Sequence, residues 1–443
     1  MTDHLVETLA PSLAPSSAQP LAGAAAPSLV TELPGPLATE LIERDLSFTS
    51  PSMPRVYPLV PRRAEGCVIE DVDGNRFLDL NAGIAVNATG HCHPDVVAAI
   101  EAQAHSLLHY CSSDFYLPIY GELCERLARL APFDGAPARV FLGNSGTEAV
   151  EGALKLVRYH TRRHHIVAFL GGFHGRTLGS LSLTASKAHY RAGFGPLLPG
   201  VHHVPYGPAG LDQLQAQVFK HLVAPGEIAA IVVEPVQGEG GYLPAPAGFL
   251  AELRSLCDEH GILLVADEVQ CGVGRTGRFW SIEHDGVVPD VVLAGKGLAS
   301  GLPLGAIIAR ADLMTWPPGT HGSTFGGNPV ACAAALATID LVEPGLRANA
   351  EAMGERLLSG LQAVAARQPL LIEVRGRGLM VGLDFPDHDV AAAVELEAFR
   401  RGLLVLTCGE RTVRLAPPLV IRADQVDTAV AGLEDTLEAV ARR

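Results

Sequence analysis

Short apolar runs recur through the middle of the chain, and segments with helical periodicity separate them. The apolar runs are 139–144, 165–170, 229–235, 261–268, 290–296 and 305–310. The helical segments include Thr147 to His160, Leu211 to Leu222 and Gly248 to His260. Continuous apolar strands that alternate with amphipathic helices are typical of a parallel sheet covered on both faces. The sequence therefore predicts an α/β fold with a mostly parallel sheet, in which ligands gather at the carboxyl ends of the strands.

Length and composition indicate a globular chain of more than one domain. Of the 443 residues, 48% are hydrophobic and 18% are charged, as in folded proteins with a large core. We expect a disordered tail over residues 1–40, an N-terminal segment over 41–104 that packs with a smaller domain, a large domain over 105–330 and the smaller domain over 331–443. The smaller domain is expected to be α+β, with helices 347–366, 388–401 and 423–441 and strands 371–374, 379–384, 403–406 and 412–415.

Charge and cysteine usage argue against several classes of partner. The net charge of -15 disfavours nucleic acid and anionic membranes. The eight cysteines are scattered without a CxxC pair, as in reduced proteins of the cytoplasm, so we expect a cytoplasmic location. His91, Cys92 and His93 have no distant partner pair, so no metal site is expected. No apolar run is long enough for a membrane span, and residues 1–40 lack the Lys or Arg of targeting segments.

Lys296 follows the apolar run 291–294 and stands between Gly295 and Gly297. Glycine on both sides lets the backbone approach a bulky ligand. The chain has only four lysines and uses arginine for most of its positive charge. An amine can lose its proton and attack a carbonyl, which a guanidinium cannot do. Two interpretations stay open at this point: a reactive amine, or a lysine that extends from a strand end into water.

Asp267 ends the run 262–266 and is expected at the same sheet edge as Lys296, 29 residues before it. The two side chains form either a structural ion pair or part of a site. If the amine holds a pyridine aldehyde, a carboxylate at the ring nitrogen keeps that nitrogen protonated, so that the ring can accept electrons. Asp267 has that role in this hypothesis, and Gln270 reaches the neighbouring phenolic oxygen.

Ser145, Gly146 and Thr147 open a predicted helix directly after the apolar run 139–142. Backbone N–H groups and the positive end of the helix dipole favour a phosphate at such a point. A serine at a helix start is, however, more often only an N-cap. The segment therefore predicts either a phosphate site or an ordinary helix start.

Further strand ends carry polar or aromatic side chains. In the stretch 171–176, Phe173 lies among glycines with His and Arg beside it, and it is either an ordinary core residue or a ring that stacks on a flat ligand. Glu234 and Glu239 follow the run 229–233. Arg414 precedes a proline corner, and its guanidinium can match a carboxylate by two parallel hydrogen bonds. Each signal is modest alone.

Taken together, seven motifs resemble the class III, or omega, aminotransferases, which use pyridoxal 5'-phosphate (PLP). In chain order they are SGTEAVEGALK, FHGRT, VEPVQGEGG, LLVADEVQCGVGRTG, AGKG, HGSTFGGNP and RLAPPL. The similarity runs from about Ser50 to the C-terminus, and it is greatest to 4-aminobutyrate aminotransferases, with acetylornithine aminotransferases near. The resemblance implies PLP-dependent transferase fold type I, amino acid and keto acid substrates, and a homodimer with shared active sites.

The resemblance also implies a role for each matching residue. Lys296 is similar to the lysine that holds the cofactor aldehyde and carries protons, and Asp267 to the partner of the ring nitrogen. The other residues implied in cofactor binding are Ser145, Gly146, Thr147, Phe173, His174, Glu234 and Gln270, with Thr324 from a second subunit. The residues implied in substrate binding are Ile84, Arg176 for a distal carboxylate, Arg414 for the α-carboxylate of glutamate, and Glu239, which neutralises Arg414 when an ω-amino acid is bound.

The implied reaction moves the amino group of an ω-amino acid to 2-oxoglutarate, giving a semialdehyde and glutamate. Residues 403–409 favour 4-aminobutyrate by likeness alone, and an acetylornithine or ornithine aminotransferase is the alternative. Class III folds also include racemases and aminomutases, which use the same lysine and cofactor without a keto acid. A non-catalytic binding protein on this fold would lack Lys296 or Asp267, and both are present.

Overall fold

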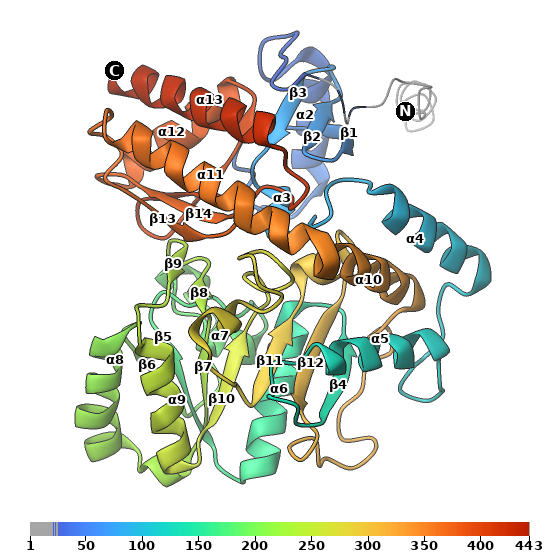
Figure 1. Ribbon diagram of the computed structural model, residues 1–443, viewed down its shortest axis with the longest axis vertical. Coiled ribbons are helices and arrows are strands. Elements are labelled where there is room, and N and C mark those ends of the chain that lie inside the picture. The colour runs from blue at the N-terminus through green and yellow to red at the C-terminus, as the bar shows by residue number, and fades with distance from the viewer. Residues whose placement is uncertain (1–20, 22, 24, 443) are drawn as a thin grey trace.

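The computed structural model describes residues 21, 23 and 25–442, and its largest element is a seven-stranded sheet (Figure 1). In spatial order the strands are β4 (Ala138–Gly143), β12 (Gly305–Arg310), β11 (Val291–Ala294), β10 (Leu263–Asp267), β7 (Ile228–Val233), β5 (His165–Phe169) and β6 (Val201–Val204). Only β12 is antiparallel to its neighbours within this sheet. The predicted α/β fold with a mostly parallel sheet is confirmed.

Alternate residues of the central strands are buried against helices on opposite faces of the sheet. Val291 and Leu293 belong to the hydrophobic cluster that contains α6 (Gly146–Thr161). Val292 and Ala294 belong to the cluster that contains α9 (Phe249–His260). Burial on both faces is why these strands are continuously apolar rather than alternating. The further helices of this half are α5 (Pro118–Arg129), α7 (Leu178–Leu183) and α8 (Pro208–Gln213), which continues as η2 (Leu214–Leu222).

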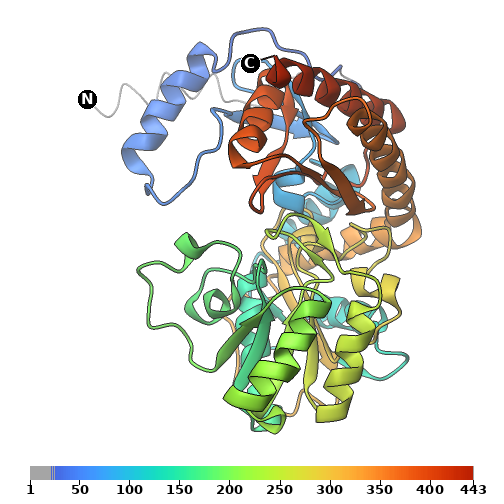
Figure 2. The ribbon, with the colours of Figure 1, turned by 90° about the vertical axis from the view of Figure 1, so that its left-hand side faces the viewer.

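The smaller half combines both ends of the chain (Figures 1 and 2). One antiparallel sheet has the order β13 (Glu373–Arg377), β14 (Met380–Asp384), β17 (Thr412–Leu415) and β16 (Leu406–Cys408). A second has the order β1 (Pro61–Glu65), β2 (Val68–Asp71), β3 (Arg76–Asp79) and β15 (Leu403–Leu404). The helices of the C-terminal part are α11 (Arg347–Ala365), α12 (His388–Arg400) and α13 (Ala423–Ala441). The parallel pairing of β15 with β3 joins the N-terminal segment to this half.

Two sequence-based boundaries differ from the structure in this half. The predicted strand 403–406 is two strands in different sheets, because β15 pairs with β3 whereas β16 pairs with β17. The predicted tail ends earlier than residue 40, although its residues 1–20, 22 and 24 lie outside the described part of the chain. Ser28 exchanges backbone hydrogen bonds of 2.9 Å with Arg76, and α2 (Pro36–Phe48) begins where the Asp73 carboxylate accepts the N–H groups of Leu37 and Ala38. Partners that lie this far away in sequence leave no local pattern.

One helical stretch within residues 25–442, Pro329–Ala365, is long and apolar enough to cross a membrane by length and composition alone. It consists of α10 (Pro329–Leu341), the turn η6 (Val342–Leu346) and α11. Half of its most apolar window is buried inside the protein, and Cys332, Ala335 and Ile339 belong to the main hydrophobic core. Burial on several sides accounts for the apolar composition of α10.

The N-terminal half also contains the helix α4 (Pro94–Ser106) and a short turn, α3 (Ala82–Ala85), with an uncommon backbone. All four residues of α3 have positive φ, including Ile84 at 67°. The carboxylate of Asp79 accepts the N–H groups of Asn81 and Ala82, and it is 2.7 Å from His91 Nε2. A left-handed turn is unfavourable for residues with side chains, so Asp79 compensates part of that strain at the start of the turn.

Candidate active site

A cavity of about 290 Å³ lies at the carboxyl ends of the central strands. Its walls are formed by Ser145, Gly146, Thr147, Phe173, His174, Gly175, Arg176, Glu234, Asp267, Val269, Gln270 and Lys296. The structure thus brings together every residue predicted to bind the cofactor except Thr324, and it adds Arg176 from the predicted substrate site. A concave site with a few convergent polar groups at this edge of a parallel sheet is where a small ligand binds.

Lys296 follows β11 and points into the cavity from a strained backbone, with φ at 39°. A Cβ atom at Gly295 would lie 3.4 Å from the backbone of Gly146, and one at Gly297 would lie 3.3 Å from the side chain of Ala88. The two glycines therefore let the lysine segment pass close to its neighbours. Burial lowers the pKa of Lys296, although the charges of Asp267 and Glu234 oppose the effect. The amine is consequently easier to deprotonate than a solvated lysine.

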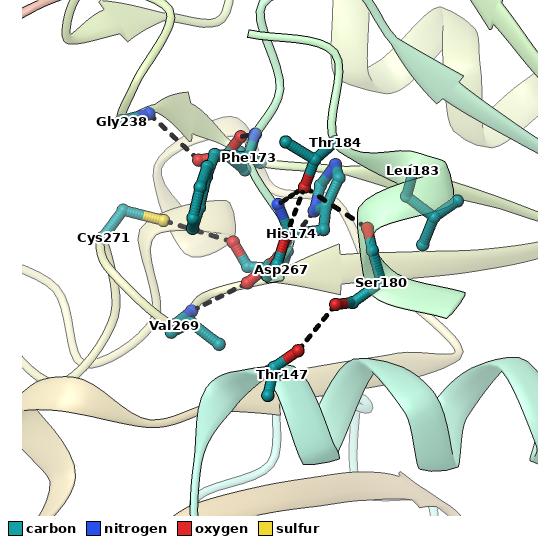
Figure 3. A network of polar contacts seen from close by, with 12 residues as sticks. Thr147, Phe173, His174, Ser180, Leu183, Thr184, Gly238, Asp267, Val269 and Cys271 are labelled. Atoms are coloured by element: carbon teal, nitrogen blue, oxygen red, sulfur yellow. Dashed lines mark hydrogen bonds and ion pairs between the residues drawn. The ribbon is translucent and has the colours of Figure 1, made fainter. Parts of the chain in front are cut away.

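Asp267 is the last residue of β10 and is 3% exposed. Its Oδ2 is 2.7 Å from Nδ1 of the buried His174, and its Oδ1 accepts the N–H of Val269 at 3.1 Å. Figure 3 shows both groups beside the carboxylate. Burial alone would lower the pKa of His174, but the hydrogen bond and charge of Asp267 raise it. The carboxylate of Asp267 therefore favours the protonated form of His174.

The N-terminus of α6 forms another wall of the cavity. Ser145 is its N-cap and accepts the N–H of Glu148 at 3.3 Å, so the N-cap interpretation is correct, while the same residue also lines the cavity. Thr147 Oγ1 lies 2.6 Å from Ser180 Oγ (Figure 3). A Cβ atom at Gly146 would come within 2.6 Å of Val269, so only glycine permits this close approach.

Glu234 connects two loops at the cavity. Its Oε1 accepts the N–H of Phe173 at 2.9 Å, and its Oε2 accepts the N–H of Gly238 at 3.0 Å. Burial raises the pKa of Glu234 to about 7; His174 opposes this rise and Asp267 adds to it. Glu234 therefore holds the backbone of Phe173, whose side chain faces the cavity (Figure 3).

Gln270 and the ion pair of Glu239 with Arg414 lie on the side of the smaller half. Gln270 Oε1 accepts the hydroxyl of the buried Tyr242 at 2.9 Å. Nη1 of Arg414, in β17, donates to Glu239 Oε1 at 2.5 Å. Arg414 is 5% exposed. The charges of both side chains act on the pKa of Lys296, Arg414 lowering it and Glu239 raising it.

Four predicted residues, Ile84, Glu239, Arg414 and Thr324, are not among the residues that line the cavity. Thr324 is exposed and lines a separate hollow together with Ser113 and His321. Ile84 is 40% exposed on the left-handed turn α3. His91, from the triplet considered for a metal, instead contacts Asp79, and no group of three His, Cys, Asp or Glu side chains in the described part of the chain is placed to hold a metal ion.

Sequence reasoning missed several contributors to the site. The pairing of His174 with Asp267 joins residues 93 positions apart, and the sequence around either residue does not predict it. Val269 and Gly175 line the cavity without polar side chains. Tyr242 could have been suspected, because it is an aromatic residue directly after the glycine-rich loop that contains Glu239.

The residues of the cavity fit PLP. A buried amine, a carboxylate beside it, a helix N-terminus lined with small residues and an aromatic side chain correspond to the aldehyde, ring nitrogen, phosphate and ring face of that cofactor. A Cβ atom at Gly146, the first residue of α6, would collide with Val269 of the cavity wall, so this end of the helix can lie against the cavity only as glycine. The fold and the cavity together thus define an enzyme of the PLP-dependent transferase class.

Comparison with known proteins identifies the family. The model of the class-III aminotransferases matches residues 49–437, and the chain belongs to this family. Its cofactor is PLP. An amine transaminase from an uncultivated Pseudomonas species, solved in a PLP-bound form, has a TM-score of 0.81 and 33% identity over 89% of this chain and 98% of its own. Ornithine aminotransferase from Toxoplasma gondii has a TM-score of 0.84 and 32% identity over 91% of this chain and 96% of its own.

Curated relatives differ in the activity they are named for. An acetylornithine aminotransferase from Methanopyrus kandleri is 46% identical over 91% of this chain and 99% of its own length. A 4-aminobutyrate aminotransferase from Escherichia coli is 40% identical over 87% and 95%. An alanine/serine racemase from Pyrococcus horikoshii is 37% identical over 93% of each chain. The predicted family and cofactor are confirmed, whereas these relatives do not select one substrate.

Proposed function

We propose that the protein moves the amino group of an ω-amino acid to 2-oxoglutarate, with 4-aminobutyrate as the donor. The ion pair of Glu239 with Arg414 is the observation that carries the proposal. Only Nη1 of the guanidinium contacts Glu239, and the buried Nε of Arg414 has no hydrogen-bond partner within the described residues. An arginine that makes one hydrogen bond to a carboxylate and has a further N–H group without a partner can exchange that carboxylate for the carboxylate of a substrate.

Both half-reactions need this exchange. An ω-amino acid has no carboxylate at the carbon that bears the amine, so Glu239 stays on Arg414. Glutamate and 2-oxoglutarate have an α-carboxylate, which replaces Glu239 on the guanidinium. Arg176 takes the distal carboxylate in both cases. The same pocket can thus accept the uncharged end of an ω-amino acid and the charged α-carboxylate of glutamate or 2-oxoglutarate.

Side chains of the cavity perform the proton transfer. PLP, when bound, accepts the electron pair that remains when the substrate C–H bond breaks. Lys296 would remove the proton from the substrate carbon that bears nitrogen and deliver it to the cofactor carbon bonded to the same nitrogen. The lowered pKa of Lys296 favours the free amine that this transfer needs. Asp267, which His174 holds in place through a 2.7 Å contact, would keep a proton on the ring nitrogen. Phe173 covers the ring face, and the N–H groups at the start of α6 hold the phosphate.

Two amino donors fit this reaction. N-acetylornithine is supported as well as 4-aminobutyrate, because relatives named for each are similar to this chain. Both donors carry an amine far from a carboxylate. A panel of 4-aminobutyrate, N-acetylornithine, ornithine and 5-aminovalerate, assayed with 2-oxoglutarate, tests the proposal, which predicts the highest kcat/KM for 4-aminobutyrate. A higher value for N-acetylornithine would replace the donor and leave the reaction type in place.

Replacing Glu239 by alanine is expected to impair the ω-amine half-reaction more than the glutamate half-reaction. Without Glu239, Arg414 faces an uncharged part of the ω-amino acid with an unpaired buried charge, a penalty of about 3 kcal/mol or a hundredfold in rate. Single-turnover absorbance measurements follow each half-reaction separately. Glu252→Ala, on an exposed position of α9, is the control and should affect neither. Equal losses in both half-reactions would remove the gating role of Glu239.

An amino-acid racemase is the second candidate, and the relative from Pyrococcus horikoshii favours retaining it. A racemase uses the same lysine and cofactor but returns the proton to the opposite face of the same carbon. Its turnover therefore proceeds without a keto acid. Incubating the enzyme with L-alanine or L-serine alone and measuring the D-isomer distinguishes the two reactions.

We also propose a homodimer in the cytoplasm. Thr324 lies outside the Lys296 cavity of its own chain, so a second subunit has to supply it if it binds the phosphate. Exposed large apolar side chains include Phe325, the next residue in the chain, and also Leu108 and Tyr116, as expected for a protein that buries part of its surface against another chain. Light scattering of the purified enzyme measures the mass that tests the dimer.

A further inference from the structure

The guanidinium of Arg176 is held by aromatic rings rather than by an acid. Its Cζ lies 4.0 Å from the ring centroid of Tyr190 and 5.7 Å from that of Phe173. Arg176 makes no hydrogen bond or ion pair to another described residue, although its side chain lines the cavity. A cation over a ring face is attracted by the quadrupole of the ring. Tyr190 therefore fixes the position of the charge without occupying its N–H donors.

Tyr190 belongs to a separate loop that contacts two residues of the cavity wall, Arg176 and Phe173. It ends the short helix η1 (Ala188–Tyr190), which lies between α7 and β6. Its ring meets that of Phe173 edge to face, with centroids 5.9 Å apart and an interplanar angle of 81°. Phe173 is in turn anchored through its backbone by Glu234. Phe173, Tyr190 and Arg176 thus form one contiguous group, the Tyr190 platform.

The Tyr190 platform leaves the N–H donors of Arg176 available to a substrate carboxylate. A guanidinium has five N–H donors, and a planar carboxylate takes two of them in parallel. If an aspartate or glutamate held Arg176, the substrate would have to compete with it, as it does at Arg414. The ring of Tyr190 restricts the side chain of Arg176 and leaves its donors free. Less conformational entropy is then lost when a carboxylate binds.

We propose that Tyr190 is a positioning residue that sets the preference of the enzyme for amines with a distal carboxylate. The inference rests on the proposed function, in which Arg176 binds that carboxylate. Tyr190 touches Arg176 and Phe173 and acts through them. Its removal weakens the binding of carboxylated donors and leaves uncharged amines unaffected.

The experiment compares Tyr190→Leu, Tyr190→Phe and Arg176→Ala in the PLP-loaded enzyme. The donors are 4-aminobutyrate and butylamine, in which a methyl group replaces the carboxylate. Single-turnover absorbance changes at rising donor concentration give a half-saturation concentration and a maximal rate for each pair. Tyr190→Leu should raise the half-saturation concentration for 4-aminobutyrate about 5-fold, with an unchanged maximal rate and no change for butylamine. Tyr190→Phe keeps the ring and should restore wild-type values.

The controls separate this inference from the function on which it rests. Phe194→Leu, at an exposed position of the same loop, should leave both donors unaffected. If Arg176→Ala raises the half-saturation concentration for 4-aminobutyrate but Tyr190→Leu does not, the platform is rejected and the carboxylate site remains. Equal rises for both donors in Tyr190→Leu also reject it, because the ring then supports the loop in general. If Arg176→Ala has no effect, the proposed carboxylate site fails, and this inference with it.

Discussion

Lys296→Ala is expected to lower turnover by about 10⁴-fold or more while the protein stays folded. The variant loses the amine that removes the substrate proton and that joins the cofactor aldehyde. The stability of the fold should be kept because Lys296 makes no hydrogen bond to a neighbouring element in the described structure. Removing the partly buried amine also removes the free-energy cost of taking that amine out of water. Circular dichroism and thermal melting measure the fold, and a coupled glutamate assay measures turnover.

A covalent readout makes this prediction independent of activity. Borohydride reduction of the PLP-loaded wild-type enzyme should add the mass of the cofactor to one peptide, the one that contains Lys296. The variant should show no such peptide. Lys220→Ala, which removes an exposed lysine outside the cavity, is the matched control and should retain both the modified peptide and full activity. Addition at another lysine in wild-type protein would contradict the assignment.

The pKa of Lys296 gives the same site a pH dependence. Burial lowers this pKa in the folded protein, so unfolding takes up a proton wherever the pH lies between the folded and unfolded values. The contribution of the free amine to stability is therefore present above the ordinary lysine pKa and is lost as the pH falls through the folded value. Cofactor bound to the amine removes this titration, so the protein without PLP should lose stability faster on acidification than the PLP-loaded enzyme.

The sequence predicted the parts of the site that depend on local chemistry. Asp267 ends one strand and Lys296 follows another, and both strands have clear apolar runs because burial on both faces requires continuous hydrophobic residues. Parallel pairing of β10 with β11 then forces the ends of both strands to the same edge. The N-terminus of α6 could be found in the same way, since small residues after a strand mark a helix start.

Contacts between distant segments could not be predicted from local pattern. His174 meets Asp267 from another strand end, and Tyr190 reaches Arg176 from a loop that has no regular period. The pairing of Ser28 with Arg76 folds a stretch whose composition is that of a tail. In each case the contacting residue lies far away in the sequence, and the residues adjacent in the chain do not determine which distant residue will be contacted. The edge strand β6 was missed because two histidines interrupt its apolar pattern.

Asp267→Asn is expected to keep PLP bound and to slow proton removal by about 10³-fold. An amide has the shape of the carboxylate but no negative charge, so it cannot keep a proton on the ring nitrogen. It also removes the charge that raises the pKa of His174. That raised pKa makes the protonated histidine a source of stability at pH values below the unfolded pKa, lost as the pH rises through the folded value. The melting temperature of the variant should therefore no longer show this dependence on pH.

Proton removal and cofactor retention have to be measured separately, since only the first should change strongly. Loss of deuterium from 4-aminobutyrate labelled at the carbon that bears nitrogen reports proton removal, and cofactor absorbance after gel filtration reports retention. Asp258→Asn, at an exposed position of α9, controls for the removal of one negative charge from the protein. A deuterium-loss rate within about twofold of wild type would place the support of the ring nitrogen on another residue. His174 is the only ionisable side chain found within hydrogen-bond distance of the Asp267 carboxylate in the described structure, so that outcome would also leave the pairing of these two residues without a role in proton removal.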